Sequence, residues 1–309
     1  MSAKDPIVPE VIIYHAQCPD GSCAAMVARE YVLNHYRGCL PGGKDDPKRA
    51  PRMMPMLYTK EVEVDIWGNV RVGEQYFSVG GKRVLIVDFS FPRTALEKMH
   101  AAADSLIVLD HHKTAAADLA GLSYCVFDMQ RSGARLAWDY FYPGKSSPWV
   151  VDYVEDRDLW KHALMLSKEV NCFLSTLPFD DLDAWARMMD LPRSHASGSG
   201  ASMLIFKEAD IRRMKERSVM AQLAGYTVPV AAAPVHESEV AGELCIERNT
   251  PFAAAFYQRA DGLYSYSLRS RSDFDVSAIA RLYGGGGHQQ AAGFAVPHPA
   301  HVPVKIKRG

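Results

Sequence analysis

The chain has 309 residues, 48% of them apolar, and its 35 Lys and Arg residues nearly balance its 36 Asp and Glu residues. This length and apolar content predict two globular domains and exclude a disordered protein. The net charge of −1 excludes the broad basic surface that holds long duplex nucleic acid, so we expect no such partner. The six cysteines form no CxxC pair, and no apolar run has the length of a membrane span. These features predict a cytoplasmic protein with no membrane partner.

Strands and helices are predicted to alternate in the first part of the chain. Apolar runs predict strands at 11–14, 83–88 and 105–110, and helical spacing predicts helices at 22–37 and 92–103. This βαβ rhythm predicts a parallel sheet with right-handed crossovers. A stretch rich in Pro, Gly and Lys at 38–52 is followed by alternating apolar residues at 62–72, which predict a hairpin. The hairpin region, 57–79, is either a lid or an insertion.

The remaining elements predict a second domain. Helices are expected at 133–142 and from residue 149, the latter ending in an acidic loop near residue 160. A Ser/Gly cluster at 192–202 is typical of a domain boundary, and an amphipathic, charged helix at about 203–223 follows it. Strands at 253–257 and 263–269 and a helix at 276–283 come next. We therefore predict an N-terminal domain over 1–191, a linker with a helix over 192–223 and a C-terminal domain over 224–309.

Three of the predicted strands end at Asp or His. The first ends at His15, the second at Asp88, and the third delivers Asp110, His111 and His112 in succession. The carboxyl ends of parallel strands border the crevice in which ligands bind. Carboxylates that converge there with imidazoles need a cation to offset their mutual repulsion. The sequence therefore predicts a metal centre.

The predicted centre holds two divalent cations. Two such ions about 3.5–4 Å apart share a bridging carboxylate, activate a water and neutralise phosphate charge. Asp88 is the natural bridge because its strand lies between two others. The expected flanking ligands are His15 and Asp20 on one side and Asp110 and His111 on the other, with a further carboxylate from Asp156. Ligands of this kind without cysteine favour Mn²⁺, with Mg²⁺ and Co²⁺ as alternatives, and leave His112 for the substrate.

The chain resembles the DHH phosphoesterase family of the RecJ superfamily. The features that carry the resemblance are the Asp110-His111-His112 triad, His15 with Asp20, the strand-end Asp88, and a GGGGH segment at 284–288 with AAG just after it. The resemblance covers nearly the whole chain. It implies an α/β protein with an N-terminal parallel-sheet DHH domain, a smaller α/β C-terminal DHH-associated domain that binds substrate, and a cleft between them. The two-domain layout is similar to that of nanoRNA-degrading exonucleases and of phosphatases of adenosine 3′,5′-bisphosphate.

The resemblance also implies roles for individual residues. The implied metal ligands are His15, Asp20, Asp88, Asp110 or His111, and Asp156. The implied catalytic residues are Asp110, His111 and His112, the last close to the scissile phosphate. The implied substrate-binding residues are Arg269, Ser270, Gly285, Gly286, Gly287 and His288. Glycines let backbone N–H groups approach a phosphate closely, and the arginine and histidine add cationic donors.

The first motif departs from the family pattern. Many relatives carry two aspartates there, whereas this chain has Asp20 alone, with Gln17, Cys18 and Ser22 at the neighbouring places. The change could weaken one metal site, alter the metal preference, or be compensated by Asp158. The start of the helix at residue 133 is either a phosphate-binding N-terminus or a plain cap.

The predicted function is hydrolysis of phosphodiesters. We expect a metal-dependent phosphodiesterase or 3′-to-5′ exonuclease that degrades short oligonucleotides, either nanoRNA or short DNA, to mononucleotides, with 3′,5′-bisphosphonucleotide phosphatase activity and homodimer formation as further options. A near-neutral chain suits short substrates because enzymes of long polymers need an extended basic track. The alternatives are a phosphodiesterase of cyclic or linear signalling dinucleotides and a nucleotide-binding sensor with a degenerate metal site.

Overall fold

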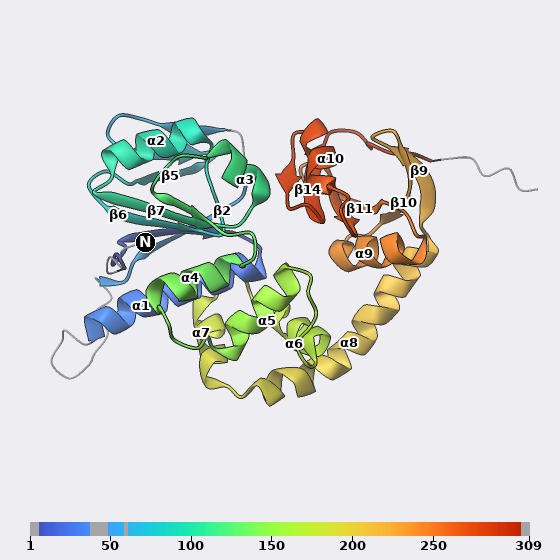
Figure 1. The fold of residues 1–309 in the computed structure, drawn as a ribbon, viewed down its shortest axis with the longest axis horizontal. Coiled ribbons are helices and arrows are strands. Elements are labelled where there is room, and N and C mark those ends of the chain that lie inside the picture. The colour runs from blue at the N-terminus through green and yellow to red at the C-terminus, as the bar shows by residue number, and fades with distance from the viewer. Residues whose placement is uncertain (1–5, 38–48, 59–60, 304–309) are drawn as a thin grey trace, which may run out of the picture. The chain divides into compact units, whose positions relative to one another are not determined.

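The computed structural model describes residues 6–37, 49–58 and 61–303. The chain divides into two compact units, Met1–Met203 and Leu204–Gly309, each treated by itself below (Figure 1). The division falls within α8, Arg193–Glu216. In the part of the chain that the structure describes, no helix is both long and apolar enough to span a bilayer.

The Ser/Gly cluster at 192–202, predicted as a domain boundary, is helical, and the two units divide directly after it. It forms the first part of α8, which begins earlier than predicted and ends at Glu216. A Cβ at Gly200 would lie 1.8 Å from the carbonyl oxygen of Glu169. The glycine therefore allows a close approach of two helices.

The first unit is built on a parallel five-stranded sheet, as predicted. Its strands are β1 (Val11–His15), β2 (Arg52–Met56), β6 (Arg83–Val87), β7 (Ser105–Asp110) and β8 (Cys125–Phe127). They lie in the order β2-β1-β6-β7-β8. Their apolar residues are buried on both faces, which is why β1, β6 and β7 are continuous apolar runs.

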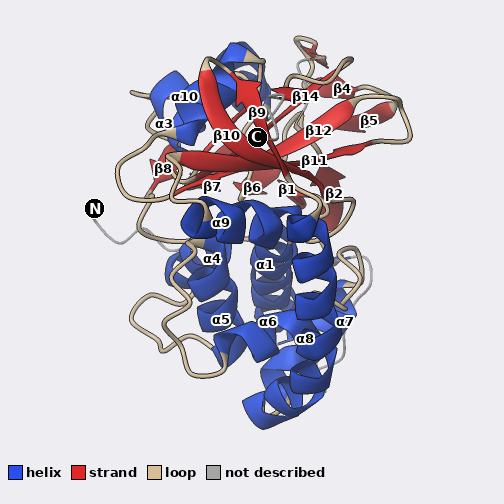
Figure 2. Ribbon diagram, turned by 90° about the vertical axis from the view of Figure 1, so that its right-hand side faces the viewer, coloured by secondary structure: helices blue, strands red, loops and turns tan. Residues whose placement is uncertain are grey.

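Helices cover one face of this sheet and a mixed layer covers the other (Figures 1 and 2). The first face packs on α1 (Pro19–Arg37) and α4 (Gly133–Phe141). Beyond these two helices, α5 (Trp149–Asp158), α6 (Ser167–Leu174) and α7 (Leu182–Asp190) complete the same core. The second packs on α2 (Arg93–Ala102). Because side chains alternate along a strand, Ile12 enters the first core and Ile13 the second. The short α3 (Lys113–Asp118) follows β7.

The predicted hairpin is a three-stranded antiparallel sheet. It comprises β3 (Val62–Val64), β4 (Asn69–Val72) and β5 (Gln75–Ser78). Val70 and Phe77 are buried in the same core as Ile13 and α2. This region is therefore an insertion packed onto the sheet.

The second unit has a mixed seven-stranded sheet in the order β13-β14-β12-β11-β10-β9-β15. Its strands are β9 (Val219–Leu223), β10 (Tyr226–Ala232), β11 (Phe252–Gln258), β12 (Tyr264–Ser270), β13 (Gly286–Gly287), β14 (Ala291–Val296) and β15 (Val302–Pro303). One face packs on α10 (Val276–Leu282) and the other on α9 (Glu237–Glu247). The sequence predicted β11, β12 and α10. It did not predict β10, whose apolar run is interrupted by Pro229.

Candidate metal centre

The predicted metal-binding residues lie at the carboxyl edge of the parallel sheet. The chain leaves β1 toward β2 and leaves β6 toward β7, so the topological switch point lies between β1 and β6. The strand register brings these ends level, and His15, Asp88 and Asp110 therefore emerge at one edge. Asp88 has a φ of +52°, a left-handed conformation that is uncommon outside glycine and is held by its surroundings.

Asp88 lies between two imidazoles. Its Oδ2 lies 3.3 Å from Nδ1 of His15, and its Oδ1 lies 3.0 Å from Nε2 of His111. The carboxylate is only 2% exposed. Its two oxygens thus face different neighbours, as a bridging ligand requires.

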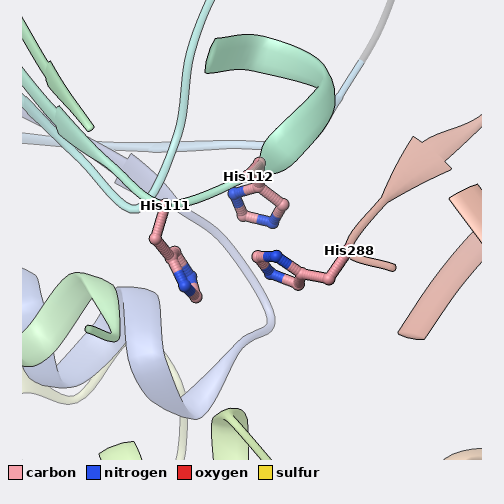
Figure 3. A group of neighbouring side chains, drawn as sticks. All are labelled: His111, His112 and His288. Carbon is pink, nitrogen blue, oxygen red and sulfur yellow. The ribbon is translucent and has the colours of Figure 1, made fainter. Parts of the chain in front are cut away.

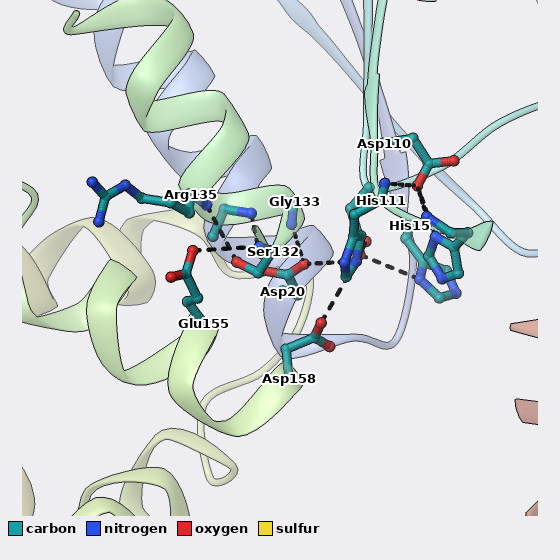
Figure 4. A network of polar contacts seen from close by, with 12 residues as sticks. His15, Asp20, Asp110, His111, Ser132, Gly133, Arg135, Glu155 and Asp158 are labelled. Atoms are coloured by element: carbon teal, nitrogen blue, oxygen red, sulfur yellow. Dashed lines mark hydrogen bonds and ion pairs between the residues drawn. The ribbon is translucent and has the colours of Figure 1, made fainter. Parts of the chain in front are cut away.

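Asp20 joins the centre from the first turn of α1. Its oxygens accept hydrogen bonds from the backbone N–H groups of Gly133 and Ala134, at 2.6 and 2.9 Å, at the start of α4. The positive end of that helix stabilises the carboxylate. Oδ2 of Asp20 also lies 3.4 Å from Nε2 of His111 (Figure 4). Asp20 therefore occupies the N-terminus of α4. The alternative that this terminus binds a phosphate is not supported, because its first N–H groups already bind the carboxylate.

Gly133 has no room for a side chain. A Cβ there would lie 2.4 Å from Cβ of Asp88 and 3.0 Å from Oδ2 of Asp20. The glycine lets the start of α4 approach both carboxylates. This residue was not among the predicted site residues.

Asp158, and not Asp156, faces the centre. The prediction of Asp156 as a ligand is corrected, because its carboxylate accepts hydrogen bonds from Ala163 N at 2.8 Å and from the hydroxyl of Ser167. Oδ2 of Asp158 lies 3.6 Å from Nε2 of His111. The acidic run is the last turn of α5 and not a loop. Side chains two residues apart on a helix point to nearly opposite sides, so only one of these two aspartates can reach the centre.

A matched pair of variants separates these two aspartates. Asp158→Asn should weaken manganese binding by roughly ten-fold or more while leaving the fold stable, because it removes a charge from the centre. Asp156→Asn should lower the free energy of unfolding by about 1–3 kcal/mol with manganese affinity retained, because it breaks loop hydrogen bonds. Calorimetric metal titration and urea unfolding of both variants check this. Equal effects of the two changes on metal affinity would contradict the assignment.

The side chains form two adjacent groups of possible ligands within the first unit. One is His15, Asp88 and His112, and the other is Asp20, His111 and Asp158; within each group one atom per residue lies within 4.8 Å of the others. Asp88 connects the groups through its contact with His111. The buried Oδ2 atoms of Asp88 and Asp158 have only long contacts with imidazole nitrogens among the described residues, at 3.3 Å from His15 and 3.6 Å from His111. The donor set and these buried oxygens fit divalent cations.

The electrostatics of the centre also favour a bound cation. Burial opposes charge on the His111 ring, but Asp158, Asp88 and Asp20 raise its pKa well above the usual value. Burial and then Asp88 and Asp158 raise the pKa of Asp20 well above its usual value. Burial opposes the charge of Asp88, yet hydrogen bonds with His111 and His15 bring its pKa well below the usual value. The carboxylates of Asp20, Asp88 and Asp158 thus lie close together with few positively charged partners. A divalent cation would neutralise their charge better than protons do.

The first motif, residues 15–22, contains a single carboxylate, that of Asp20. Ser22 is buried and its hydroxyl donates to the carbonyl oxygen of Phe179 at 2.8 Å. Burial and then Asp88 raise the pKa of the Cys18 thiol well above its usual value, so the thiol stays protonated. Compensation by Asp158 is therefore the alternative that the geometry favours.

Asp110 holds the loop that carries both histidines. It is fully buried and accepts hydrogen bonds from the hydroxyl of Ser90, from His111 N at 2.7 Å and from Nδ1 of His112 at 2.7 Å. Burial opposes its ionisation, but His112, His111 and Ser90 lower its pKa to about 2. Asp110 belongs to neither group of possible ligands. We interpret it as the residue that positions His112 and not as a metal ligand.

The two histidines after β7 point in different directions (Figure 3). Their rings are 4.9 Å apart and inclined at 63°. His111 enters the group with Asp20, and His112 enters the group with His15. Tyr58, which was not predicted, packs its ring against both His15 and His112, with centroids 5.2 and 5.6 Å away. No sequence motif singles this tyrosine out.

The predicted substrate-binding residues lie together in the second unit. Arg269 and Ser270 end β12, which pairs with β14, and Gly286 and Gly287 form β13 on the other side of β14. Arg269 donates to the hydroxyl of Ser238 at 2.6 Å. Gly287 has a φ of +136°, and a Cβ there would lie 2.6 Å from a neighbouring carbonyl oxygen. Gly285 precedes β13, and His288 follows it at a turn closed by its N–H to Ala291 O, 2.8 Å.

Comparisons with known proteins agree with this architecture. Residues 226–307 match the family model of the DHHA1 domain. The uncharacterized protein R106 of Acanthamoeba polyphaga mimivirus is 27% identical over 300 residues, covering 93% of this chain and 67% of that protein. A solved DHH domain, described as belonging to a family of ribosomal proteins, has a TM-score of 0.50 and 13% identity over 92% of this chain and 82% of its own. RecJ from Thermus thermophilus, solved with Mn²⁺, gives a TM-score of 0.47 and 15% identity over 92% of this chain and 49% of RecJ.

The second unit thus contains a match to the DHHA1 domain, and the fold of the chain is similar to that of a solved DHH domain. The match over residues 226–307 agrees with the DHH-associated C-terminal domain that the sequence resemblance implies.

Proposed function

We propose that the protein is a manganese-dependent phosphodiesterase that hydrolyses short oligonucleotides to mononucleotides. The observation that carries the proposal is the pair of ligand groups connected by the carboxylate of Asp88. The predicted ligands His15, Asp20, Asp88 and His111, together with Asp158 and His112, would hold two divalent cations. Bound there, such cations neutralise phosphate charge and lower the pKa of a water.

The chain's own residues prepare the centre for this chemistry. The ionised carboxylate of Asp110 can only accept a hydrogen bond, so Nδ1 of His112 donates to it and the orientation of the His112 ring is fixed. Asp20 is fixed by two backbone N–H groups, and Asp88 by two imidazoles. These contacts hold the donor atoms in place before substrate arrives, which reduces the reorganisation required during reaction.

Several observations favour a short nucleic acid as the substrate. The net charge of −1 provides no long basic track for a polymer. In the second unit, Arg269 and the glycines near His288 offer a cationic donor and closely approachable backbone for a phosphate group. Bisphosphonucleotide phosphatase activity and cleavage of signalling dinucleotides require the same centre and differ in what lies next to the phosphate.

The proposal predicts hydrolysis of a labelled dinucleotide. Purified full-length protein with Mn²⁺ should release mononucleotides, and the Asp110→Ala/His111→Ala variant should be slower by roughly a thousand-fold or more. Product analysis by chromatography measures both. Tight binding without turnover in Mn²⁺, Mg²⁺ and Co²⁺ would support a sensor instead. Cleavage by the double variant at the wild-type rate would show that the centre is wrongly assigned.

A second variant tests the proposed role of the second unit. His288→Ala should raise KM for the dinucleotide by about ten-fold and change kcat much less, because the residue is proposed to bind the substrate and not to take part in the chemical step. Steady-state kinetics measure the separate changes in KM and kcat. The matched control is Gln258→Ala, a change at an exposed position at the end of β11. A KM equal to that of the wild type would contradict this role.

A further inference from the structure

A cavity of about 580 Å³ opens in the first unit beside the metal centre. Its walls come from the end of β1, the end of β2, the turn between β4 and β5 and the segment before α7. We call it the base pocket and define it by six of its lining residues: Ala16, Gln17, Leu57, Gln75, Phe179 and Asp180. Its volume lies within the range of small-molecule binding sites, roughly 300–1,000 Å³.

The base pocket adjoins the metal centre through two segments. Ala16 and Gln17 directly follow His15, and Gln17 adopts a left-handed φ of 55°. Leu57 directly precedes Tyr58, whose ring packs at 5.2 Å on the ring of His15. A group in the pocket would therefore lie next to a group at the metal centre.

The chemistry of the walls excludes a phosphate as the occupant. Among the described residues that line the pocket there is no Lys, Arg or His, and Asp180 adds a negative charge. The rest of the lining is mainly apolar or aromatic, with two amides from Gln17 and Gln75. Such a surface suits a neutral, flat group that carries hydrogen-bonding atoms on its edge.

We propose that the base pocket holds one nucleobase of the substrate while the adjoining phosphodiester lies at the metal centre. The inference rests on the proposed function and names the feature that makes a nucleotide its substrate. An ionised carboxylate only accepts hydrogen bonds, so Asp180 favours bases with exocyclic amino groups, which are adenine, guanine and cytosine, over uracil. The insertion β3–β5 completes the pocket and thereby acts in substrate selection.

The proposal is tested with a substrate that lacks one base. The kcat/KM of full-length protein with Mn²⁺ is measured for a diadenosine dinucleotide and for the two versions with one base removed. For the wild type, loss of the base that the pocket holds should lower kcat/KM by about ten-fold or more, the range for loss of a stacked base. In Leu57→Trp, which fills the pocket, the intact and abasic substrates should be cleaved at similar rates. In Ile66→Trp, a control on the exposed β3–β4 turn, the wild-type ratio should persist.

Two outcomes separate this inference from the proposed function. If the wild type cleaves the dinucleotide and Leu57→Trp keeps the wild-type ratio, the base pocket is wrongly assigned and the proposed function stands. If the wild type cleaves no substrate, the proposed function fails, and calorimetric titration with adenosine tests the pocket by itself. Adenosine should bind the wild type more tightly than uridine does, and Asp180→Asn should reduce that preference. Equal binding of adenosine to wild type and Leu57→Trp would overturn the inference.

Discussion

Replacing Asp88 with asparagine is expected to lower kcat/KM for manganese-dependent dinucleotide hydrolysis by roughly a thousand-fold or more. The change preserves shape but removes the charge of the carboxylate that contacts both His15 and His111. Asp88 belongs to one group of possible ligands and contacts His111 of the other, so a single substitution should impair both. Steady-state kinetics over a range of manganese concentrations measure the loss.

A matched substitution controls for the change of charge. Asp104→Asn alters an exposed aspartate just before β7, at the opposite end of that strand from the centre. It should leave kcat/KM within about two-fold of the wild type, because isolated surface charges contribute little. Manganese should raise the melting temperature of this control and of the wild type, but not of Asp88→Asn. Asp88→Asn with activity within about ten-fold of the wild type would contradict its role as the shared ligand.

Gly133→Ala is expected to damage stability and metal binding together. A methyl group there would lie 2.4 Å from Cβ of Asp88, and both residues are buried. Overpacking of this kind costs about 1–3 kcal/mol. The displaced start of α4 would also move the N–H groups that fix Asp20. Urea unfolding and manganese titration should therefore show both losses.

The same substitution elsewhere in a helix should have the opposite effect. Gly198 lies in α8 and is exposed, and a Cβ added there would meet no atom within 4 Å. Gly198→Ala should raise the free energy of unfolding by up to about 1 kcal/mol, because alanine is the better helix former. If Gly133→Ala were as stable as Gly198→Ala and bound manganese normally, the close approach of α4 to the centre would be refuted.

The sheet that carries the centre could be predicted from the sequence because its signals are local. Each of β1, β6 and β7 is a continuous apolar run that ends at His15, Asp88 or Asp110. Parallel strands buried on both faces produce such runs, and their carboxyl ends share one edge. The convergence of these residues followed from topology alone.

The contributions of helices to the centre could not be predicted in the same way. The choice between Asp156 and Asp158 depends on whether α5 continues through the acidic run, and a solvated loop has the same composition. Gly133 and Tyr58 contact the centre from distant parts of the chain, and their roles arise from tertiary packing. The helical Ser/Gly segment of α8 likewise includes a tertiary contact, the close approach of Gly200 to the carbonyl oxygen of Glu169, that the local sequence does not reveal.

Counting bound manganese by electron paramagnetic resonance is the most direct test of the metal centre. The two ligand groups predict two Mn²⁺ ions per chain at pH 8. The pKa of His111 is raised in the folded protein, so its ring is protonated below that pKa and must lose a proton to bind an ion. Affinity should therefore fall from pH 8 to pH 6. A wild-type protein that binds no Mn²⁺ at millimolar concentration would contradict the account. An Asp88→Asn variant that binds Mn²⁺ as tightly as the wild type would contradict it as well.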